Sequence, residues 1–171
     1  MEKMNDHKLS TYYTSFDIVS IRELNVNDFD SYLPLLLQME KYFGSDTISP
    51  PQEGKFKEYL NKRKENINLH LTIIAIEIST QKIIGTGTFW VEQKFLRNLG
   101  KVGHFDDIFV HEDFRNKKVG TKILDTLVRI ALNEENCYKI IAGSDDEKCE
   151  FFEKVGFKKT SNRMMINNER V

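Results

Sequence analysis

The sequence predicts an α/β (α+β) protein in which helices cover both faces of a mixed β-sheet. Runs rich in β-branched and aromatic residues occupy the middle of the chain and predict neighbouring strands. Strand and helix patterns alternate toward the C-terminus, which favours a sheet packed between helices. The 171 residues, of which 40% are hydrophobic, are enough for one domain with one core.

The first predicted elements are a strand over Phe16–Leu24 and a helix after it. Polar residues within Asn25–Asp30 are suited to cap that helix. Pro34 is expected in its first turn, where the missing N–H is tolerated. The apolar positions of the helix recur at helical spacing and comprise Phe29, Tyr32, Leu33, Leu36 and Phe43.

A loop is predicted over Gly44–Gly54, which contains Ser49-Pro50-Pro51, and a short charged helix over Phe56–Glu65. The turn at Ser79–Gln81 joins two strands as a hairpin, and a third strand follows the hairpin. The three strands are predicted over Leu69–Ile78, Lys82–Val91 and Val102–Val110.

The C-terminal part continues the alternation. A helix has one apolar face that contains Val119, Ile123, Leu127, Ile130 and Ala131. A short buried strand, a second helix and a final strand are then predicted over Tyr138–Ala142, Asp145–Val155 and Phe157–Ile166. Gly156 is expected to end the second helix at the C′ position.

The composition restricts the class of partner. The formal net charge is -1, which does not favour nucleic acid or an anionic membrane surface, and no apolar run approaches the length that spans a bilayer. Residues 1–15 lack the apolar segment of a signal peptide, so we expect a flexible N-terminal extension, a single domain over 16–171 and a cytoplasmic protein. Cys137 and Cys149 show neither a metal-ligand nor a disulfide spacing, so we expect free thiols and no metal.

The segment Val102–Thr121 combines features of a phosphate-binding turn. A strand that ends in 107–110 leads through a basic turn, Arg115-Asn116-Lys117-Lys118-Val119-Gly120, into a helix. Consecutive N–H groups beside a helix N-terminus bind anionic phosphate, and Gly120 lets the backbone approach a ligand closely. On these residues alone, the alternative of a solvated basic turn before an ordinary helix is slightly favoured.

Several segments together resemble one enzyme family. RNKKVGT resembles the pyrophosphate loop of the GNAT superfamily, R/Q-x-x-G-x-G/A, and FFEKVGF resembles its closing F-Y-x-x-x-G-F turn. GHFDDIFV, EQKF and CYKI resemble segments of the glucosamine-6-phosphate N-acetyltransferase family within it. The resemblance extends from about Phe16 to Ile166, and its strength lies in the order and spacing of the motifs.

The resemblance implies a GNAT fold with a splayed sheet, in which acetyl-CoA enters a gap between two parallel strands. The backbone of Ile108, Phe109 and Val110 would then bind the pantetheine arm as a further strand would. The alternative, a plain core strand, concerns their side chains and is compatible with that role. The implied cofactor-binding residues also include Arg115, Asn116, Lys117, Lys118, Val119, Gly120, Thr121, Lys148, Cys149 and Glu150.

The resemblance also implies direct attack of the sugar amine on the acetyl thioester, without an acyl-enzyme. Asp107 or its carbonyl would orient the amine, Asp106 would hold sugar hydroxyls, and the N–H of Ile108 would stabilise the oxyanion. A solvent-facing carboxylate is the alternative for one of the two aspartates. His104 is expected to be structural.

The implied substrate-binding set contains cations and one departure from the family pattern. Lys94, Arg97 and Arg163 match substrate-contacting positions, and Lys101 lies close by in sequence. Solvated surface charge is the alternative for each of these cations. Gly143 stands where a carboxylate is usual. The resemblance further implies a homodimer whose acceptor pockets are shared between subunits.

Other departures concern the mechanism. Phe152 stands where the family usually has the tyrosine that protonates the CoA thiolate, and Lys148 replaces an asparagine. Lys118 replaces a glycine of the phosphate loop. We expect water or another donor to protonate the thiolate and no other tyrosine hydroxyl to reach the sulfur, where a Tyr138 hydroxyl would show that the role had moved. The expected function is acetyl transfer to glucosamine 6-phosphate on the route to UDP-N-acetylglucosamine. A GNAT enzyme for another small amine or a protein N-terminus, and a catalytically silent acyl-CoA-binding module, are the alternatives.

Overall fold

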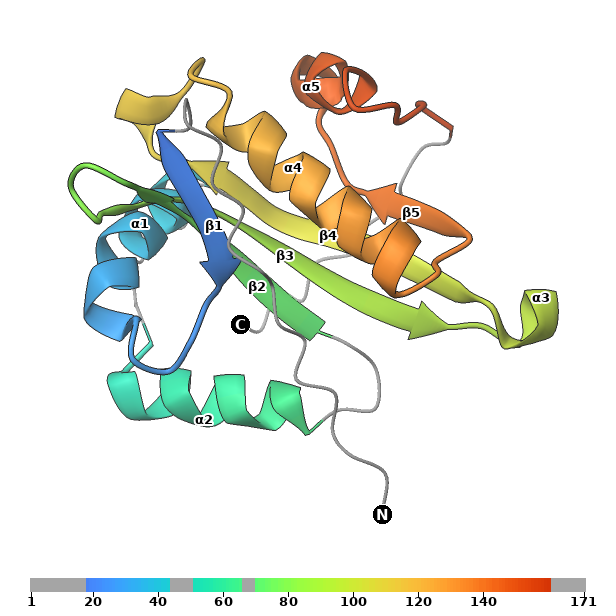
Figure 1. The fold of residues 1–171 in the computed structure, drawn as a ribbon, viewed down its shortest axis with the longest axis horizontal. Helices are drawn as coiled ribbons and strands as arrows, with labels where there is room; N and C mark the ends of the chain where they lie inside the picture. The colour runs from blue at the N-terminus through green and yellow to red at the C-terminus, as the bar shows by residue number, and fades with distance from the viewer. Residues whose placement is uncertain (1–17, 44–50, 66–69, 161–171) are drawn as a thin grey trace, which may run out of the picture.

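The computed structural model describes residues 18–43, 51–65 and 70–160, which form the fold in Figure 1. Within these residues, five strands make one sheet in the order β1-β2-β3-β4-β5. The first four strands pair antiparallel, whereas β5 lies parallel to β4. The strands are β1 (Val19–Glu23), β2 (His70–Glu77), β3 (Ile83–Gln93), β4 (Lys101–Val110) and β5 (Lys139–Ala142).

Helices cover both faces of this mixed sheet, as the sequence predicts. One face packs against α4 and α5, and the other packs against α1 and α2 (Figure 1). A one-turn helix, α3, lies at the tip between β3 and β4. The helices are α1 (Phe29–Tyr42), α2 (Glu53–Lys64), α3 (Leu96–Leu99), α4 (Val119–Arg129) and α5 (Cys149–Glu153).

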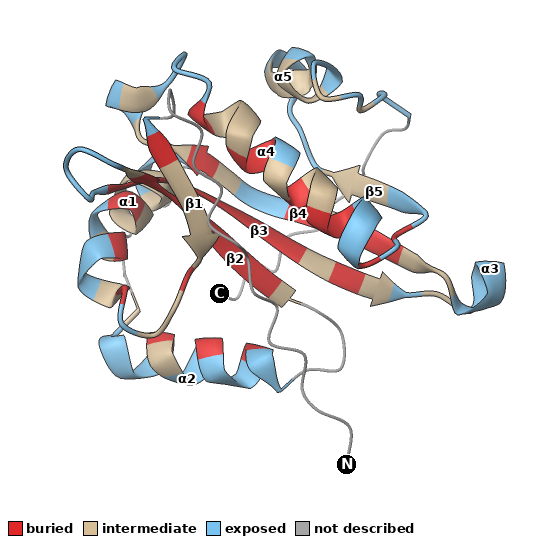
Figure 2. Ribbon diagram, viewed as in Figure 1, coloured by how far each residue is buried: buried red, intermediate tan, exposed pale blue. Residues whose placement is uncertain are grey.

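The two faces of the sheet support two hydrophobic cores. Successive side chains of a strand point to opposite faces, so β2 contributes to both. Ile73 and Ala75 pack on the α4 side, whereas Ile74 and Ile76 pack on the α1 and α2 side. Figure 2 shows the resulting band of buried residues through the central strands, with exposed residues on the outer helix surfaces.

α4 lies directly against the sheet because β3 has a glycine beneath it. A Cβ atom on Gly87 would lie 2.8 Å from Ile123 Cγ2 and 3.1 Å from Leu127 Cδ1. The absence of that atom lets the apolar face of α4 approach β3 closely. A π-helical turn over Ile130–Glu134 ends α4, and the chain then enters β5.

The fourth strand contains a β-bulge. Thr88 pairs with Asp106 and Thr86 pairs with Phe109, so Gly87 alone lies opposite the two residues between them on β4. Asp107 is one of these two and has a φ of 53°. A bulge of this kind bends the strand and changes the direction of its side chains.

The parallel pairing of β4 with β5 is short. The register runs from Val102–Lys139 to Phe105–Ala142 and stops there. β4 continues for five more residues, Asp106–Val110, while the chain leaves β5 toward α5. The two strands are therefore paired at one end of the sheet and separate at the other.

The predicted strands in the middle of the chain are confirmed, with ends shifted by no more than two residues in the described part. The predicted hairpin is also present, and the Gln81 N–H donates to the Glu77 carbonyl at 2.8 Å. Gly156 has a φ of 96°. The N–H groups of Gly156 and Phe157 donate to the Glu153 and Phe152 carbonyls, which places Gly156 at the C′ position of a Schellman motif, as predicted.

Other predicted boundaries were wrong. Pro34 is the sixth residue of α1 rather than part of its first turn, and α2 begins at Glu53 because Gly54 joins the helix. The predicted helix over Asp145–Val155 is a 3-10 turn followed by the short α5. The described part of the last predicted strand, Phe157–Thr160, forms no strand.

Some expectations concern other parts of the chain. The predicted N-terminal extension, Arg163, the segment 44–50 and residues 161–166 of the last predicted strand lie outside the described residues. Within the described ranges, no helix has the length and apolar character needed to cross a membrane.

Candidate active site

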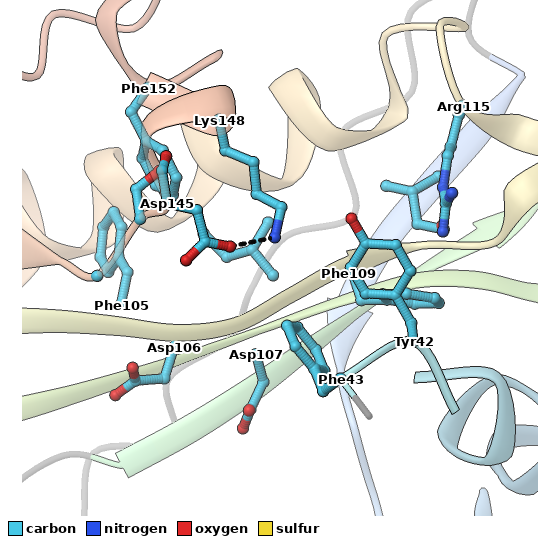
Figure 3. Close-up of a pocket in the computed structure, with 14 residues that line it drawn as sticks. Tyr42, Phe43, Phe105, Asp106, Asp107, Phe109, Arg115, Asp145, Lys148 and Phe152 are labelled. Carbon is cyan, nitrogen blue, oxygen red and sulfur yellow. Dashed lines mark hydrogen bonds and ion pairs between the residues drawn. The ribbon is translucent and has the colours of Figure 1, made fainter. Parts of the chain in front are cut away.

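A pocket of about 490 Å³ opens where β4 and β5 separate. β4 forms one wall, the segment between β5 and α5 forms the opposite wall, and the end of α1 closes one side (Figure 3). Its lining residues are Tyr42, Phe43, Phe105, Asp106, Asp107, Ile108, Phe109, Val110, Arg115, Gly143, Ser144, Asp145, Lys148 and Phe152.

The edge of β4 presents backbone to this pocket. Ile108, Phe109 and Val110 all line it and lie beyond the last residue that pairs with β5. A strand edge without a neighbouring strand offers N–H and C=O groups at the spacing of a β-ladder. The pocket can therefore accept an extended, amide-containing chain as an additional strand.

Two adjacent carboxylates stand at the bulge of β4. Asp106 accepts a hydrogen bond from Trp90 Nε1 at 3.0 Å. Burial raises the pKa of the Asp107 carboxyl, and the negative charge of Asp106 raises it further. Hydrogen bonding from Thr88 acts in the opposite direction. A raised pKa makes the Asp107 carboxylate a better proton acceptor than an ordinary surface aspartate.

An ion pair lies on the opposite wall of the pocket. Lys148 Nζ is 2.9 Å from Asp145 Oδ2 (Figure 3). Hydrogen bonding to Asp145 raises the pKa of Lys148, and the nearby Tyr42 contributes in the same direction. Phe152 lines the same wall and packs against Phe157 with ring centroids 5.5 Å apart. This wall combines a cation with an apolar ring.

The predicted phosphate loop forms a turn beside the pocket. Asn116 and Lys118 both have a φ of 62°, and Lys118 is the N-cap residue of α4. This left-handed conformation accounts for the usual glycine at the position of Lys118. The Arg115 guanidinium lies 4.9 Å from the centre of the Tyr42 ring, and its Nε donates to the Val110 carbonyl at 3.2 Å. Arg115 thus supports the turn from inside the pocket.

The sequence model of the acetyltransferase (GNAT) family matches residues 36–157 of this chain. The chain belongs to that family. A glucosamine 6-phosphate N-acetyltransferase 1 of Dictyostelium discoideum is 34% identical over 151 residues, which cover 88% of this chain and 91% of that protein. A glucosamine 6-phosphate N-acetyltransferase of Arabidopsis thaliana is 37% identical over 144 residues, with 84% and 93% covered.

Solved structures agree with the GNAT assignment. The crystal structure of glucosamine-6-phosphate N-acetyltransferase from Arabidopsis thaliana has a TM-score of 0.77 at 27% identity and covers 88% of this chain and 99% of that chain. A Trypanosoma brucei acetyltransferase has a TM-score of 0.76 at 23% identity, with 88% and 99% covered, and supports the fold. GNAT acetyltransferases use acetyl-CoA as the acetyl donor.

Many of the residues predicted for the GNAT site line one pocket. They are Asp106, Asp107, Ile108, Phe109, Val110, Arg115, Gly143, Lys148 and Phe152. Asn116, Lys117, Lys118, Val119, Gly120 and Thr121 form the adjoining turn and the start of α4, while Cys149 and Glu150 begin α5. In the described part of the chain, no group of three or more His, Cys, Asp or Glu residues is arranged to hold a metal ion.

Other predicted residues lie away from the pocket. Lys94 pairs with Glu92, and Arg97 lies 4.8 Å from the centre of the Tyr138 ring near the tip between β3 and β4. Lys101 begins β4, about 20 Å from Asp107 at ~3.3 Å per strand residue. The Tyr138 N–H donates to the Lys101 carbonyl at 2.9 Å, so Tyr138 lies at the same end of the sheet as Lys101, and it does not line the pocket.

His104 has structural contacts, in agreement with its expected role. Its ring stacks on Trp90 with centroids 3.8 Å apart, and its Nε2 lies 2.9 Å from Glu92 Oε2. It does not line the pocket. Burial and the nearby Glu135 raise the pKa of the buried Cys137 thiol, which favours its protonated form.

The sequence prediction did not assign five polar or aromatic pocket residues to the site: Tyr42, Phe43, Phe105, Ser144 and Asp145. Tyr42 and Phe43 come from the end of α1, and Asp145 comes from the loop after β5. The helical pattern marked Phe43 as an apolar core position, but it gave no sign that Tyr42 reaches a site more than sixty residues away in sequence. The pairing of Asp145 with Lys148 has a weak signal in their i, i+3 spacing.

Cofactor binding should depend on the phosphate loop. A Cβ atom on Gly120 would lie 3.3 Å from the Phe151 ring, so Gly120→Leu crowds both the turn and the approach of a pyrophosphate. We expect weaker acetyl-CoA binding by calorimetry in a protein that remains folded by circular dichroism. Gly54→Leu is the matched control because its Cβ meets no atom within 4 Å. Unchanged affinity in Gly120→Leu would exclude this loop as the cofactor site.

Proposed function

We propose that this chain transfers the acetyl group of acetyl-CoA to the amine of D-glucosamine 6-phosphate. The products are N-acetylglucosamine 6-phosphate and CoA, on the route to UDP-N-acetylglucosamine. The observation that carries this proposal is the similarity, at 34–37% identity over more than four fifths of the chain, to relatives named for that reaction. The pocket supports it because it offers a strand edge to the cofactor and carboxylates to an amine.

In this proposal the pantetheine arm of acetyl-CoA lies along Ile108–Val110 and its pyrophosphate lies at the turn before α4. The amides of the arm then pair with β4 beyond Phe105, the last β4 residue that pairs with β5. The N–H of Ile108 polarises the thioester carbonyl and stabilises the oxyanion of the tetrahedral intermediate. The positive end of the α4 dipole and the basic turn favour the phosphate groups.

The acceptor amine approaches from the side of the two aspartates. A sugar amine titrates near a protein α-amino group, roughly 8, so a weak acceptor is sufficient to take its proton. In the proposal Asp107 takes that proton, which its raised pKa and its position in the pocket lining support, and Asp106, which lines the same pocket, holds sugar hydroxyls. No described residue lining the pocket is a cysteine or histidine, which agrees with direct attack rather than an acyl-enzyme.

The sugar phosphate requires cations, and two sets are available. Arg115 and Lys148 line the pocket of the same chain. Lys94 and Arg97 lie far from that pocket along the sheet. We propose that the protein acts in the cytoplasm as a homodimer, in which the tip between β3 and β4 of one subunit supplies Lys94 and Arg97 to the other.

A thiol-release assay tests the proposed function directly. Purified protein with acetyl-CoA should release CoA much faster with glucosamine 6-phosphate than with unphosphorylated glucosamine. Faster release with a polyamine or a peptide N-terminus would instead identify an acetyltransferase for another amine. Binding of both substrates without any CoA release would indicate a silent acyl-CoA-binding module, as the replacements at Phe152 and Gly143 allow.

Removal of the two cations at the β3–β4 tip should impair substrate phosphate recognition. The Lys94→Ala/Arg97→Ala variant should raise the KM for glucosamine 6-phosphate several-fold and leave the KM for acetyl-CoA within about twofold. Lys57→Ala/Lys62→Ala removes two exposed cations from α2 and serves as the charge-matched control. If both constants stay at wild-type values in the first variant, the phosphate is held elsewhere, and Arg115 and Lys148 are the remaining cations.

Introduction of a hydroxyl at position 152 should have a limited effect. Phe152→Tyr keeps the ring that lines the pocket and adds one O–H. General-acid help is typically worth roughly 10²–10⁴-fold, and a thiol of pKa roughly 8.5 is already a fair leaving group. We expect a normally folded variant whose turnover differs from wild type by less than about a hundredfold. A larger increase in kcat would show that the wild-type protein lacks a proton donor for the thiolate.

A further inference from the structure

The pocket contains a phenol on the side opposite Phe152. Tyr42, the last residue of α1, lines the same cavity as Phe152 on the α5 wall. Figure 3 shows the Tyr42 ring rising into the pocket, with its hydroxyl on the side of the Lys148 ammonium group. A hydroxyl is thus present in the pocket although the residue at position 152 has none.

The Tyr42 ring has four neighbours, one of which is the adjacent Phe43 ring at a centroid distance of 5.4 Å. It packs edge-on against Phe109 with ring centroids 5.5 Å apart, and the Arg115 guanidinium lies 4.9 Å from its centre. The Lys148 ammonium group lies 5.2 Å from the same ring centre and is fixed by its ion pair with Asp145. These contacts place the ring between the β4 wall and the α5 wall, beside the backbone that takes the pantetheine arm in the proposed function.

Four residues that line the pocket carry an O–H or N–H donor on their side chains: Tyr42, Arg115, Ser144 and Lys148. A guanidinium does not give up its proton, and the Ser144 hydroxyl donates to the Asp145 carbonyl at 2.9 Å. Lys148 is engaged by Asp145, which raises the pKa of Lys148 and so opposes release of a proton. The Tyr42 phenol is the remaining side chain with a proton that it can give to a thiolate.

We propose that Tyr42 is a catalytic residue that protonates the departing CoA thiolate, and that Lys148 stabilises the resulting phenolate. This inference rests on the proposed acetyl transfer. The amine nitrogen bonds to the thioester carbon and loses its proton to Asp107. The carbonyl then re-forms, the C–S bond breaks with its electron pair on sulfur, and the Tyr42 O–H proton moves to that sulfur. Solvent returns a proton to the phenolate and removes one from Asp107, which balances the cycle.

Protonation of the CoA thiolate requires a hydroxyl within reach of the sulfur, so the test removes and restores a hydroxyl in the pocket. Tyr42→Phe keeps the ring and therefore its packing against Phe109 and Arg115, so it isolates the hydroxyl. Tyr42→Phe/Phe152→Tyr restores a hydroxyl to the same pocket from the α5 wall. Tyr59→Phe is the matched control, because Tyr59 is an exposed residue of α2 that does not line the pocket.

The experiment measures kcat and KM for these variants by CoA release, and acetyl-CoA affinity by calorimetry. We expect Tyr42→Phe to lose about a hundredfold in kcat, the low end of general-acid effects, with acetyl-CoA affinity within about twofold of wild type. The double variant should regain most of the lost kcat, and Tyr59→Phe should match wild type. A structural role for Tyr42 would not produce rescue from position 152.

Several results would overturn the proposal. An unchanged kcat in Tyr42→Phe, or a loss that Phe152→Tyr does not restore, would exclude Tyr42 as the proton donor. Protonation of the thiolate is the same step for every amine acceptor. The kcat of each variant relative to wild type is therefore measured with whichever amine the wild-type protein acetylates. If the wild-type protein releases CoA with another amine but not with glucosamine 6-phosphate, only the proposed substrate is rejected. If it releases CoA with none of the amines, both proposals are rejected.

Discussion

The structure depends on the point at which two parallel strands stop pairing. β4 and β5 share a ladder only as far as Phe105 and Ala142, and β4 then continues alone. A strand edge inside a folded protein needs partners for its backbone groups, so the separation creates both a cavity and a demand for hydrogen bonds within it. An extended ligand with amide groups meets that demand, which explains why a strand, rather than a set of side chains, forms the centre of the site.

The elements around the gap give each wall its chemistry. The bulge of β4 contains Asp107, which lines the cavity and has a left-handed conformation, and burial raises the pKa of its carboxyl. Gly87 lets α4 lie close to β3, and the turn at Lys118 leads into the start of the same helix. α1 reaches the gap from the other face of the sheet and brings Tyr42 to Lys148. The residues that line the pocket thus come from different layers of one fold.

The sequence predicted the fold, and it grouped residues that line one wall of the pocket, for identifiable reasons. β-branched runs and the apolar face of α4 have strong periodic signals. The turn at Gly156 is predictable because its hydrogen-bond pattern is local in sequence. The residues from 106 to 121 are continuous in sequence, so a motif describes them. Tyr42 and Asp145 come to the pocket only through tertiary packing, and no local pattern marks them. Lys94 and Arg97 are the opposite case. The family resemblance assigned them to the substrate site, but within one chain they lie away from the pocket, near the tip between β3 and β4.

The central claim is that the free edge of β4 binds acetyl-CoA through its backbone. Amide hydrogen exchange over residues 108–110, measured with and without saturating acetyl-CoA, tests it most directly. Binding should strongly protect the amides of Ile108 and Val110, which face the gap. Little change is expected at Phe109, which already pairs with Thr86 of β3, or in Ile73–Ala75, which pair on both sides within the sheet. Saturated binding without added protection at Ile108 and Val110 would contradict the claim.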